Sequence, residues 1–149
     1  MSTLVLGPLL RHVGPTTATV WVETGAPCTV EVLGHRARTF TVHDQHYAIV
    51  VVRDLEPGTV RTYEVHLDGD RVWPLEGAGT PPSRIRTRPA RTDEGADGPE
   101  LQVVFGSCRY PPTDDPALEA SLGVDALDAY ARRLMDQVAD LDEIGRAHV

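Results

Sequence analysis

One cysteine in the second half of the chain has the clearest potential for chemistry. The apolar run at residues 101–105 leads to the small-residue corner Gly106-Ser107, and Cys108 comes next. An apolar run of this kind is typical of a strand buried on both faces of a parallel sheet. Because ligands bind beyond the carboxyl ends of such strands, the sequence predicts that Cys108 lies at a binding or catalytic loop.

Two chemical roles are open to this thiol. A thiolate is a good ligand for a transition metal. A nucleophilic cysteine would instead require an activating base and oxyanion donors close by. Arg109 is adjacent, but no histidine is near in sequence, and the phosphate-cradling loop of cysteine phosphatases is missing. The sequence therefore favours metal ligation over thiol catalysis.

Other polar and aromatic residues are weaker candidates. The segment His43-Asp-Gln-His46 offers two imidazoles and a carboxylate, but zinc prefers four ligands, so a solvated hairpin tip is the better interpretation. Cys28 is most simply a small buried apolar residue. Trp21 and Trp73 could form a binding patch, but packing against the neighbouring domain is the better interpretation.

The first ninety residues must form a β-rich domain. Residues 17–22, 28–32 and 63–67 alternate apolar and polar side chains, as strands with one wet face do, and residues 46–52 could form a central strand. Turn sequences separate these runs, among them Leu33-Gly34 and Asp68-Gly69, a strong hairpin signal. We expect residues 1–90 to be a β-sandwich, immunoglobulin- or fibronectin type III-like, of about seven short antiparallel strands.

The rest of the chain predicts the opening of an α/β domain. Residues 91–100 lack large apolar side chains and are expected to be a linker. In residues 101–142, the strand and the Cys108 loop precede a short helix from Pro116 to its stop at Gly123, and then an amphipathic helix. This second helix carries Leu127, Leu134 and Leu141 on its apolar stripe and Asp136 on its solvent side. Because no second parallel strand follows, we expect a truncated α/β segment.

The last seven residues have a separate interpretation. Residues 143–149, EIGRAHV, correspond to one reading frame of a widely used short-read sequencing adapter. We interpret them as read-through of library DNA, so that His148 is no ligand.

Charge and cysteine content narrow the function. The net charge of −8 argues against a nucleic-acid surface and against binding to an anionic membrane. No apolar run is long enough to cross a membrane, and the N-terminus carries no secretory signal. Two cysteines cannot build a disulfide framework, so a reducing cytoplasm is the expected compartment.

Three segments carry a resemblance to a known family. Residues 6–22, Leu55-Glu-Pro-Gly-Thr59 and Phe105-Gly-Ser-Cys-Arg109 resemble the N-terminal part of PhoD-like (alkaline phosphatase D) metallophosphoesterases. The 55–59 segment, followed by Tyr63, also resembles the E-to-F corner of immunoglobulin-like domains, although Tyr63 comes two residues late. In this family such a domain precedes a calcineurin-like catalytic domain.

The resemblance implies that Cys108 is an iron ligand, beside calcium ions, in an enzyme acting on phosphate esters. The Gly-Asp-x-x-Tyr, Gly-Asn-His and later histidine motifs are absent here. We therefore expect the chain to be an inactive N-terminal fragment that holds no metal tightly, with its catalytic residues unknown and its oligomeric state open. The alternatives are a β-sandwich binding module without catalysis and, less favoured, thiol catalysis by Cys108.

The DNA that follows codon 142 in the source genome tests this interpretation. We expect a Gly-Asp-x-x-Tyr segment within the next few dozen codons, since the missing ligands must follow the first catalytic strand. Sequencing that locus gives the answer, and a natural stop codon directly after residue 149 would contradict it.

Overall fold

A computed structural model describes residues 2–77, 79, 81–90, 116–123 and 125–146. The chain divides into two units, Met1–Asp93 and Glu94–Val149, and each is described by itself. The described residues form ten strands and two helices: β1 Leu4–Val13, β2 Ala18–Thr24, β3 Thr29–Val32, β4 His35–Arg38, β5 Phe40–Val42, β6 Gln45–Val52, β7 Val60–Thr62, β8 Val65–Leu67, β9 Asp70–Trp73, β10 Arg84–Arg86, α1 Pro116–Leu122 and α2 Ala126–Arg146.

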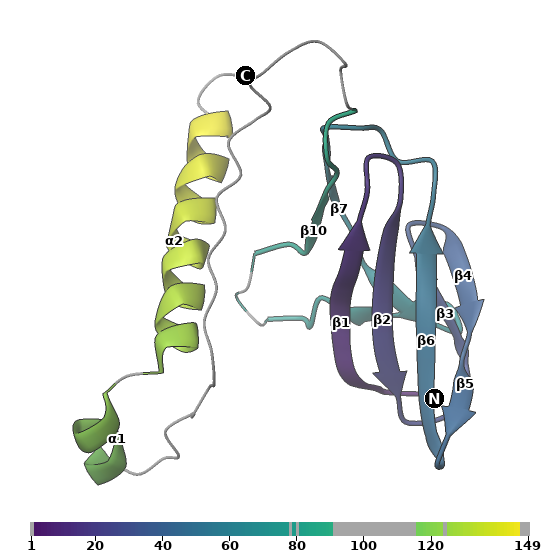
Figure 1. Ribbon diagram of the computed structural model, residues 1–149, viewed down its shortest axis with the longest axis horizontal. Helices are drawn as coiled ribbons and strands as arrows, with labels where there is room; N and C mark the ends of the chain where they lie inside the picture. Colours follow the sequence, from purple (N-terminus) through teal and green to yellow (C-terminus); the bar gives the residue numbers. More distant parts are fainter. Residues whose placement is uncertain (1, 78, 80, 91–115, 124, 147–149) are drawn as a thin grey trace. The chain divides into compact units, whose positions relative to one another are not determined.

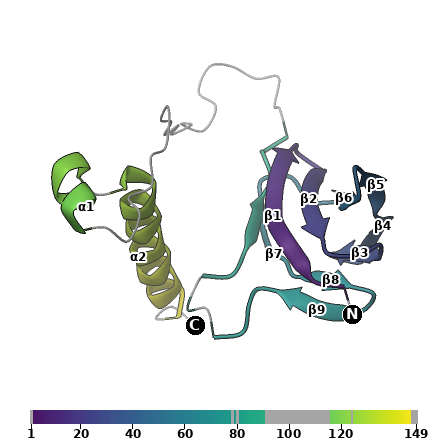
Figure 2. The same ribbon diagram turned by 90° about the horizontal axis from the view of Figure 1, so that it is seen from below.

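The strands of the first unit form two four-stranded antiparallel sheets and one small two-stranded sheet. Their orders are β1-β2-β6-β5, β4-β3-β8-β9 and β10-β7. The two larger sheets form two layers, with β1, β2 and β6 in one and β3, β8 and β9 in the other (Figures 1 and 2). The strand count exceeds the expected seven because the path from Thr29 to Val52 is divided among four strands and β7 pairs separately with β10.

The core lies between the inner faces of the two larger sheets. The alternation expected for residues 17–22, 28–32 and 63–67 is confirmed, since the side chains predicted to point inward are all buried. The buried apolar residues are Ala18, Val20, Val22, Cys28, Val30, Val32, Ala48, Val50, Val52, Leu55, Tyr63, Val65, Leu67 and Ile85. Residues 46–52 do lie in a central strand, because β6 pairs with β2 on one side and β5 on the other.

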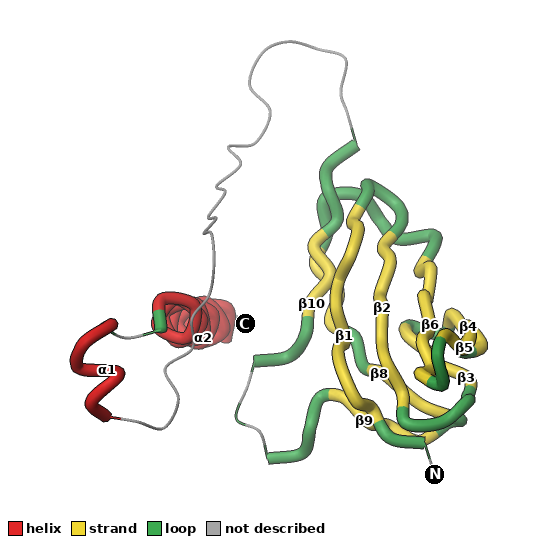
Figure 3. The backbone as a smooth tube through the Cα atoms, turned by 60° about the horizontal axis from the view of Figure 1, so that its bottom comes forward, coloured by secondary structure: helices red, strands yellow, loops and turns green. Residues whose placement is uncertain are grey.

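Three two-residue turns fix the register of the hairpins. Leu33-Gly34, His43-Asp44 and Asp68-Gly69 each have positive φ at both positions, which is the geometry of a type I′ turn. These turns join β3 to β4, β5 to β6 and β8 to β9 (Figure 3). The hairpin predicted at Asp68-Gly69 is confirmed. Asp68 also accepts a hydrogen bond from the Thr29 backbone N–H at 2.8 Å, which ties this turn to the start of β3.

Thr39 marks the point where the chain passes from one sheet to the other. It lies between β4, in the second sheet, and β5, in the first. Its hydroxyl accepts a hydrogen bond from the Cys28 N–H at 3.0 Å, and its own N–H donates to the Cys28 carbonyl at 3.0 Å. The backbone beside Cys28 therefore anchors this crossing, and the Cys28 side chain belongs to the core.

In the second unit the structure describes two helices, α1 and α2. The start at Pro116 and the stop at Gly123, which has φ of +83°, are as expected from the sequence. Asp125 caps α2 by accepting a hydrogen bond from the Leu127 N–H at 3.0 Å. Asp136 is exposed on α2, which continues through residues 143–146. The predicted linker at 91–100 and the strand at 101–105 lie outside the described residues.

Among the residues described, no helix is long and apolar enough to cross a membrane.

Two isoleucines on strands provide a test of the core. Ile85 is fully buried, whereas Ile49 is 47% exposed. We expect Ile85→Ala to lower the free energy of unfolding by about 2–5 kcal/mol, because it removes buried methyl groups and leaves a cavity.

Urea denaturation of the 149-residue chain at submicromolar concentration, where contacts between copies do not contribute, measures this loss, with Ile49→Ala as the matched control that should cost less than about 1 kcal/mol. Equal losses in the two variants would show that the core has been placed wrongly.

Candidate functional site

The residue with the strongest chemical prediction cannot be placed. Cys108, the expected iron ligand, lies outside the described residues, as do Arg109 and the apolar run before them. Cys28 is a free, buried cysteine whose surroundings are apolar. The described residues therefore leave the metal role of Cys108 as a proposal.

The segment His43-Asp-Gln-His46 forms the tip and first residues of the β5–β6 hairpin. His43 and Asp44 are the two exposed turn residues, and the His46 ring lies 2.9 Å from the Thr41 hydroxyl across the hairpin. Within the described part of the chain, no group of three or more His, Cys, Asp or Glu side chains is placed to hold a metal ion. The geometry of this segment is that of a hairpin turn.

A cleft of about 500 Å³ opens on the solvent side of the second sheet. Its lining comes from β3, the following turn, the β7–β8 segment and the loop after β9: Glu31, Leu33, Gly34, Thr62, Tyr63, Glu64, His66, Pro74 and Pro82. Apolar and aromatic walls thus surround two carboxylates and one imidazole. Such a mixture suits recognition of a small molecule or a peptide side chain.

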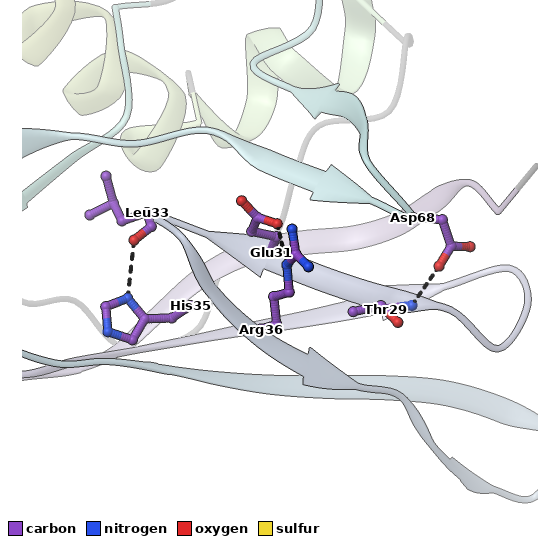
Figure 4. Close-up of polar contacts among 6 residues, drawn as sticks. All are labelled: Thr29, Glu31, Leu33, His35, Arg36 and Asp68. Atoms are coloured by element: carbon purple, nitrogen blue, oxygen red, sulfur yellow. Dashed lines mark hydrogen bonds and ion pairs between the residues drawn. The ribbon is translucent and has the colours of Figure 1, made fainter.

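The carboxylates at this cleft already have arginine neighbours. Glu31 accepts a hydrogen bond from Arg36 Nε at 2.6 Å, as Figure 4 shows beside the Leu33–His35 and Thr29–Asp68 contacts. Glu64 lies 3.7 Å from His66 and 3.8 Å from Arg71. Because these pairs are partly exposed, each contributes at most about 1 kcal/mol to stability. They balance the local charge, which leaves the cleft without a strong preference for cations or anions.

A buried polar contact forms one wall of the cleft. Tyr63 is 7% exposed, and its side chain forms a hydrogen bond with Ser83. The Ser83 hydroxyl also accepts from Trp73 Nε1 at 2.8 Å, and the Ser83 carbonyl accepts from the Tyr63 N–H at 3.0 Å. Burial raises the pKa of the Tyr63 phenol, and the bond with Ser83 partly offsets that rise. These contacts hold Trp73 against the core of the first unit.

Thr87, rather than Tyr63, forms the side-chain hydrogen bonds that hold the corner at residues 55–59. The Thr87 hydroxyl, almost completely buried, donates to the Glu56 carbonyl at 2.6 Å and accepts from the Thr59 N–H at 2.9 Å. Tyr63 instead forms its side-chain bond with Ser83, twenty residues later. The corner is therefore modified from the immunoglobulin-like pattern. Sequence reasoning missed Ser83 and Thr87, although Ser83, Ile85 and Thr87 alternate with exposed or half-exposed arginines.

An apolar surface covers the solvent side of the first sheet, which we call the outer face. Register places on it the side chains that alternate with the buried ones: Leu6, Leu9, Trp21, Phe40, Val42, Tyr47, Ile49 and Val51. Six of them are 38–53% exposed. The Tyr47 ring stacks on Trp21 with centroids 5.5 Å apart and lies 5.9 Å from Phe40. Trp21 thus belongs to a surface cluster rather than to the core.

The comparisons with known proteins concern the first unit. Residues 1–85 match the family model described as Domain of unknown function (DUF7800). This is 85 of 149 residues, more than half of the chain, and it covers the sandwich up to Ile85 in β10. No curated protein and no solved structure matches the chain significantly.

The buried phenol of Tyr63 predicts a loss of stability at alkaline pH. In the folded chain its pKa is raised above the ordinary value of 10.0, so as the pH rises through 10.0 the unfolded chain loses this proton first. The stabilisation that the protonated Tyr63 phenol contributes is fully present below pH 10.0. It is lost as the pH rises from 10.0 through the raised pKa of the folded chain.

Urea denaturation at a series of pH values measures the effect. Tyr63→Phe should cost about 0.5–1.5 kcal/mol at neutral pH through the lost hydrogen bond. It should also give a flatter alkaline decline, whereas Tyr47→Phe on the outer face should keep the decline. A wild-type decline that Tyr63→Phe does not change would refute the assignment.

Proposed function

The chain belongs to the family described as Domain of unknown function (DUF7800), and from this premise we propose that it is the N-terminal part of a PhoD-like metal-dependent phosphoesterase. In this proposal the first unit is an immunoglobulin- or fibronectin type III-like domain. Residues 101–142 begin the catalytic α/β domain, and Cys108 is one ligand of its iron ion. The substrate is a phosphate ester of the intact enzyme.

One observation carries the proposal. The segment Phe105-Gly-Ser-Cys-Arg109, which resembles the end of the first catalytic strand in that family, follows a β-sandwich in the chain. After it come α1, with proline at its first residue, and the amphipathic helix α2. The order of a sandwich, a cysteine after an apolar run and then helices is the order that the family resemblance implies.

The architecture of the first unit supports its part of the proposal. Two antiparallel four-stranded sheets enclose one core with alternating inward side chains, as in immunoglobulin-like sandwiches. The 55–59 corner is fixed by a buried hydroxyl, although Thr87 supplies it in place of tyrosine. This difference affects a structural corner and none of the residues proposed for chemistry.

In this proposal the intact enzyme supplies most of the metal ligands. A thiolate at Cys108 suits iron better than calcium. Because the Gly-Asp-x-x-Tyr and Gly-Asn-His motifs that the resemblance implies are not in residues 1–149, we expect iron and calcium to be held with further residues of the intact enzyme. We expect the 149-residue chain to be inactive. The free thiol of Cys28 is consistent with a cytoplasmic compartment.

Replacing the proposed ligand in the parent protein tests the function. We expect Cys108→Ser to lower the bound iron and the phosphoesterase activity together, by about 100-fold or more, since metal ligands contribute more than the residues that orient them. Iron analysis and a phosphate-ester assay on the same preparations measure both quantities.

Cys28→Ser is the matched control, because Cys28 is buried in the sandwich and should affect stability without changing the iron content. A Cys108→Ser variant that keeps its metal but loses its activity would indicate thiol catalysis instead. A variant that keeps both would overturn the proposal.

The second candidate function is a binding module without catalysis. The cleft beside Tyr63 favours it, because a lining that mixes apolar, aromatic and polar side chains is of a kind that binds small molecules or side chains. Under this alternative, residues 1–90 alone would retain all the ligand binding of the parent protein. Under the enzyme proposal they would retain none of the iron.

A further inference from the structure

The outer face is more apolar than the surface of a soluble sandwich normally is. An antiparallel sheet usually buries one face and exposes polar residues on the other. Here the exposed side carries Leu9, Phe40, Ile49 and Val51. We propose that the outer face is the contact surface of a homodimer, in which it packs against the same face of a second copy of this chain.

The area of the outer face fits a second copy. A large apolar side chain offers on the order of 150–200 Å² when free, so the six that are 38–53% exposed present roughly 500 Å², and the less exposed Trp21 and Tyr47 bring the total to roughly 600 Å². This is at the upper end of the largest apolar patch on a typical monomer, about 300–600 Å². Two copies would bury roughly 1,200 Å², the lower end of the range for specific interfaces. The area therefore predicts a reversible dimer rather than an obligate one.

Glu23 and His12 lie at opposite ends of the outer face. Glu23 is paired with Leu6 at one end of β2, and His12 is paired with Thr19 at the other. A twofold axis in the plane of the interface, perpendicular to the strands, reverses the strand direction of the second copy. Each Glu23 carboxylate then lies toward the His12 end of its partner. The apolar side chains between Glu23 and His12 then contact the apolar side chains of the same face of the partner, as in an isologous interface.

The edge strands of the first sheet, β1 and β5, are poorly suited to pairing with another chain, which favours contact through the outer face. β1 has register shifts around Gly7, whose φ is +101°, and β5 has three residues. Bulged and very short edge strands discourage pairing with another chain. The open surface that remains is the outer face, where the stacked rings of Trp21 and Tyr47 are already ordered.

Sedimentation of the 149-residue chain over a concentration series tests the proposal. We expect a monomer–dimer equilibrium with a dissociation constant on the order of micromolar. Ile49→Arg should raise that constant by more than about 100-fold, because it places an unpaired charge at the centre of the interface. Leu75→Arg is the matched control, because Leu75 is 61% exposed but lies outside the outer face, and it should leave the constant unchanged.

Circular dichroism establishes that each variant is folded. If Ile49→Arg does not fold, Phe40→Ala replaces it and should weaken the dimer about tenfold. Acrylamide quenching of tryptophan in the wild-type chain should fall as the concentration rises, because Trp21 becomes covered. A monomer at all concentrations, assemblies that grow beyond two copies, or a dimer that keeps its strength in the folded face variant would each overturn the proposal.

Discussion

Contact between two rows of aliphatic side chains, all but one of them valine, determines the rest of this sandwich. Val20, Val22, Val50 and Val52 from the first sheet meet Val30, Val32, Val65 and Leu67 from the second, all fully or almost fully buried. Burial of each such side chain stabilises the fold by about 1.5–3 kcal/mol before entropic costs. Because both rows are stiff and of similar size, the sheets can pack at the usual distance of about 10 Å.

The sequence predicted the fold correctly wherever one residue and its near neighbours specify the backbone conformation. The alternation from Ala18 to Val22 gave the correct inward face, since a strand places every second side chain on one side. Asp68-Gly69 specified its hairpin because both residues tolerate the positive φ that a two-residue turn demands. Pro116 and Gly123 bounded α1 for similar reasons. In each case the decisive interaction spans only a few positions of the chain.

Contacts between distant residues were not predictable in this way. Ser83 reaches Tyr63 and Trp73, and Thr87 reaches Glu56, only after the sheets have assembled. No short pattern distinguishes a serine that will meet a buried phenol from one that will meet water. Cys108 illustrates the opposite limit: its interpretation depends on neighbouring residue types and on family resemblance, and it lies outside the residues for which geometry is described.

Strand β6 shows why the apolar character of the outer face was hidden in the sequence. Its residues 47–52 are apolar on both sides, which in a sequence indicates a strand buried on both faces. The structure buries Ala48, Val50 and Val52 and leaves Ile49 and Val51 partly exposed. The inward residues are small because the opposite sheet is close, whereas the aromatic rings of Trp21 and Tyr47 lie on the side with room for them. In a chain with a net charge of −8, this face carries Glu23 as its one carboxylate among the described residues. Strand β6 therefore has an apolar side chain set on each face. One set packs within the sandwich, and the other is suited to packing against a further layer.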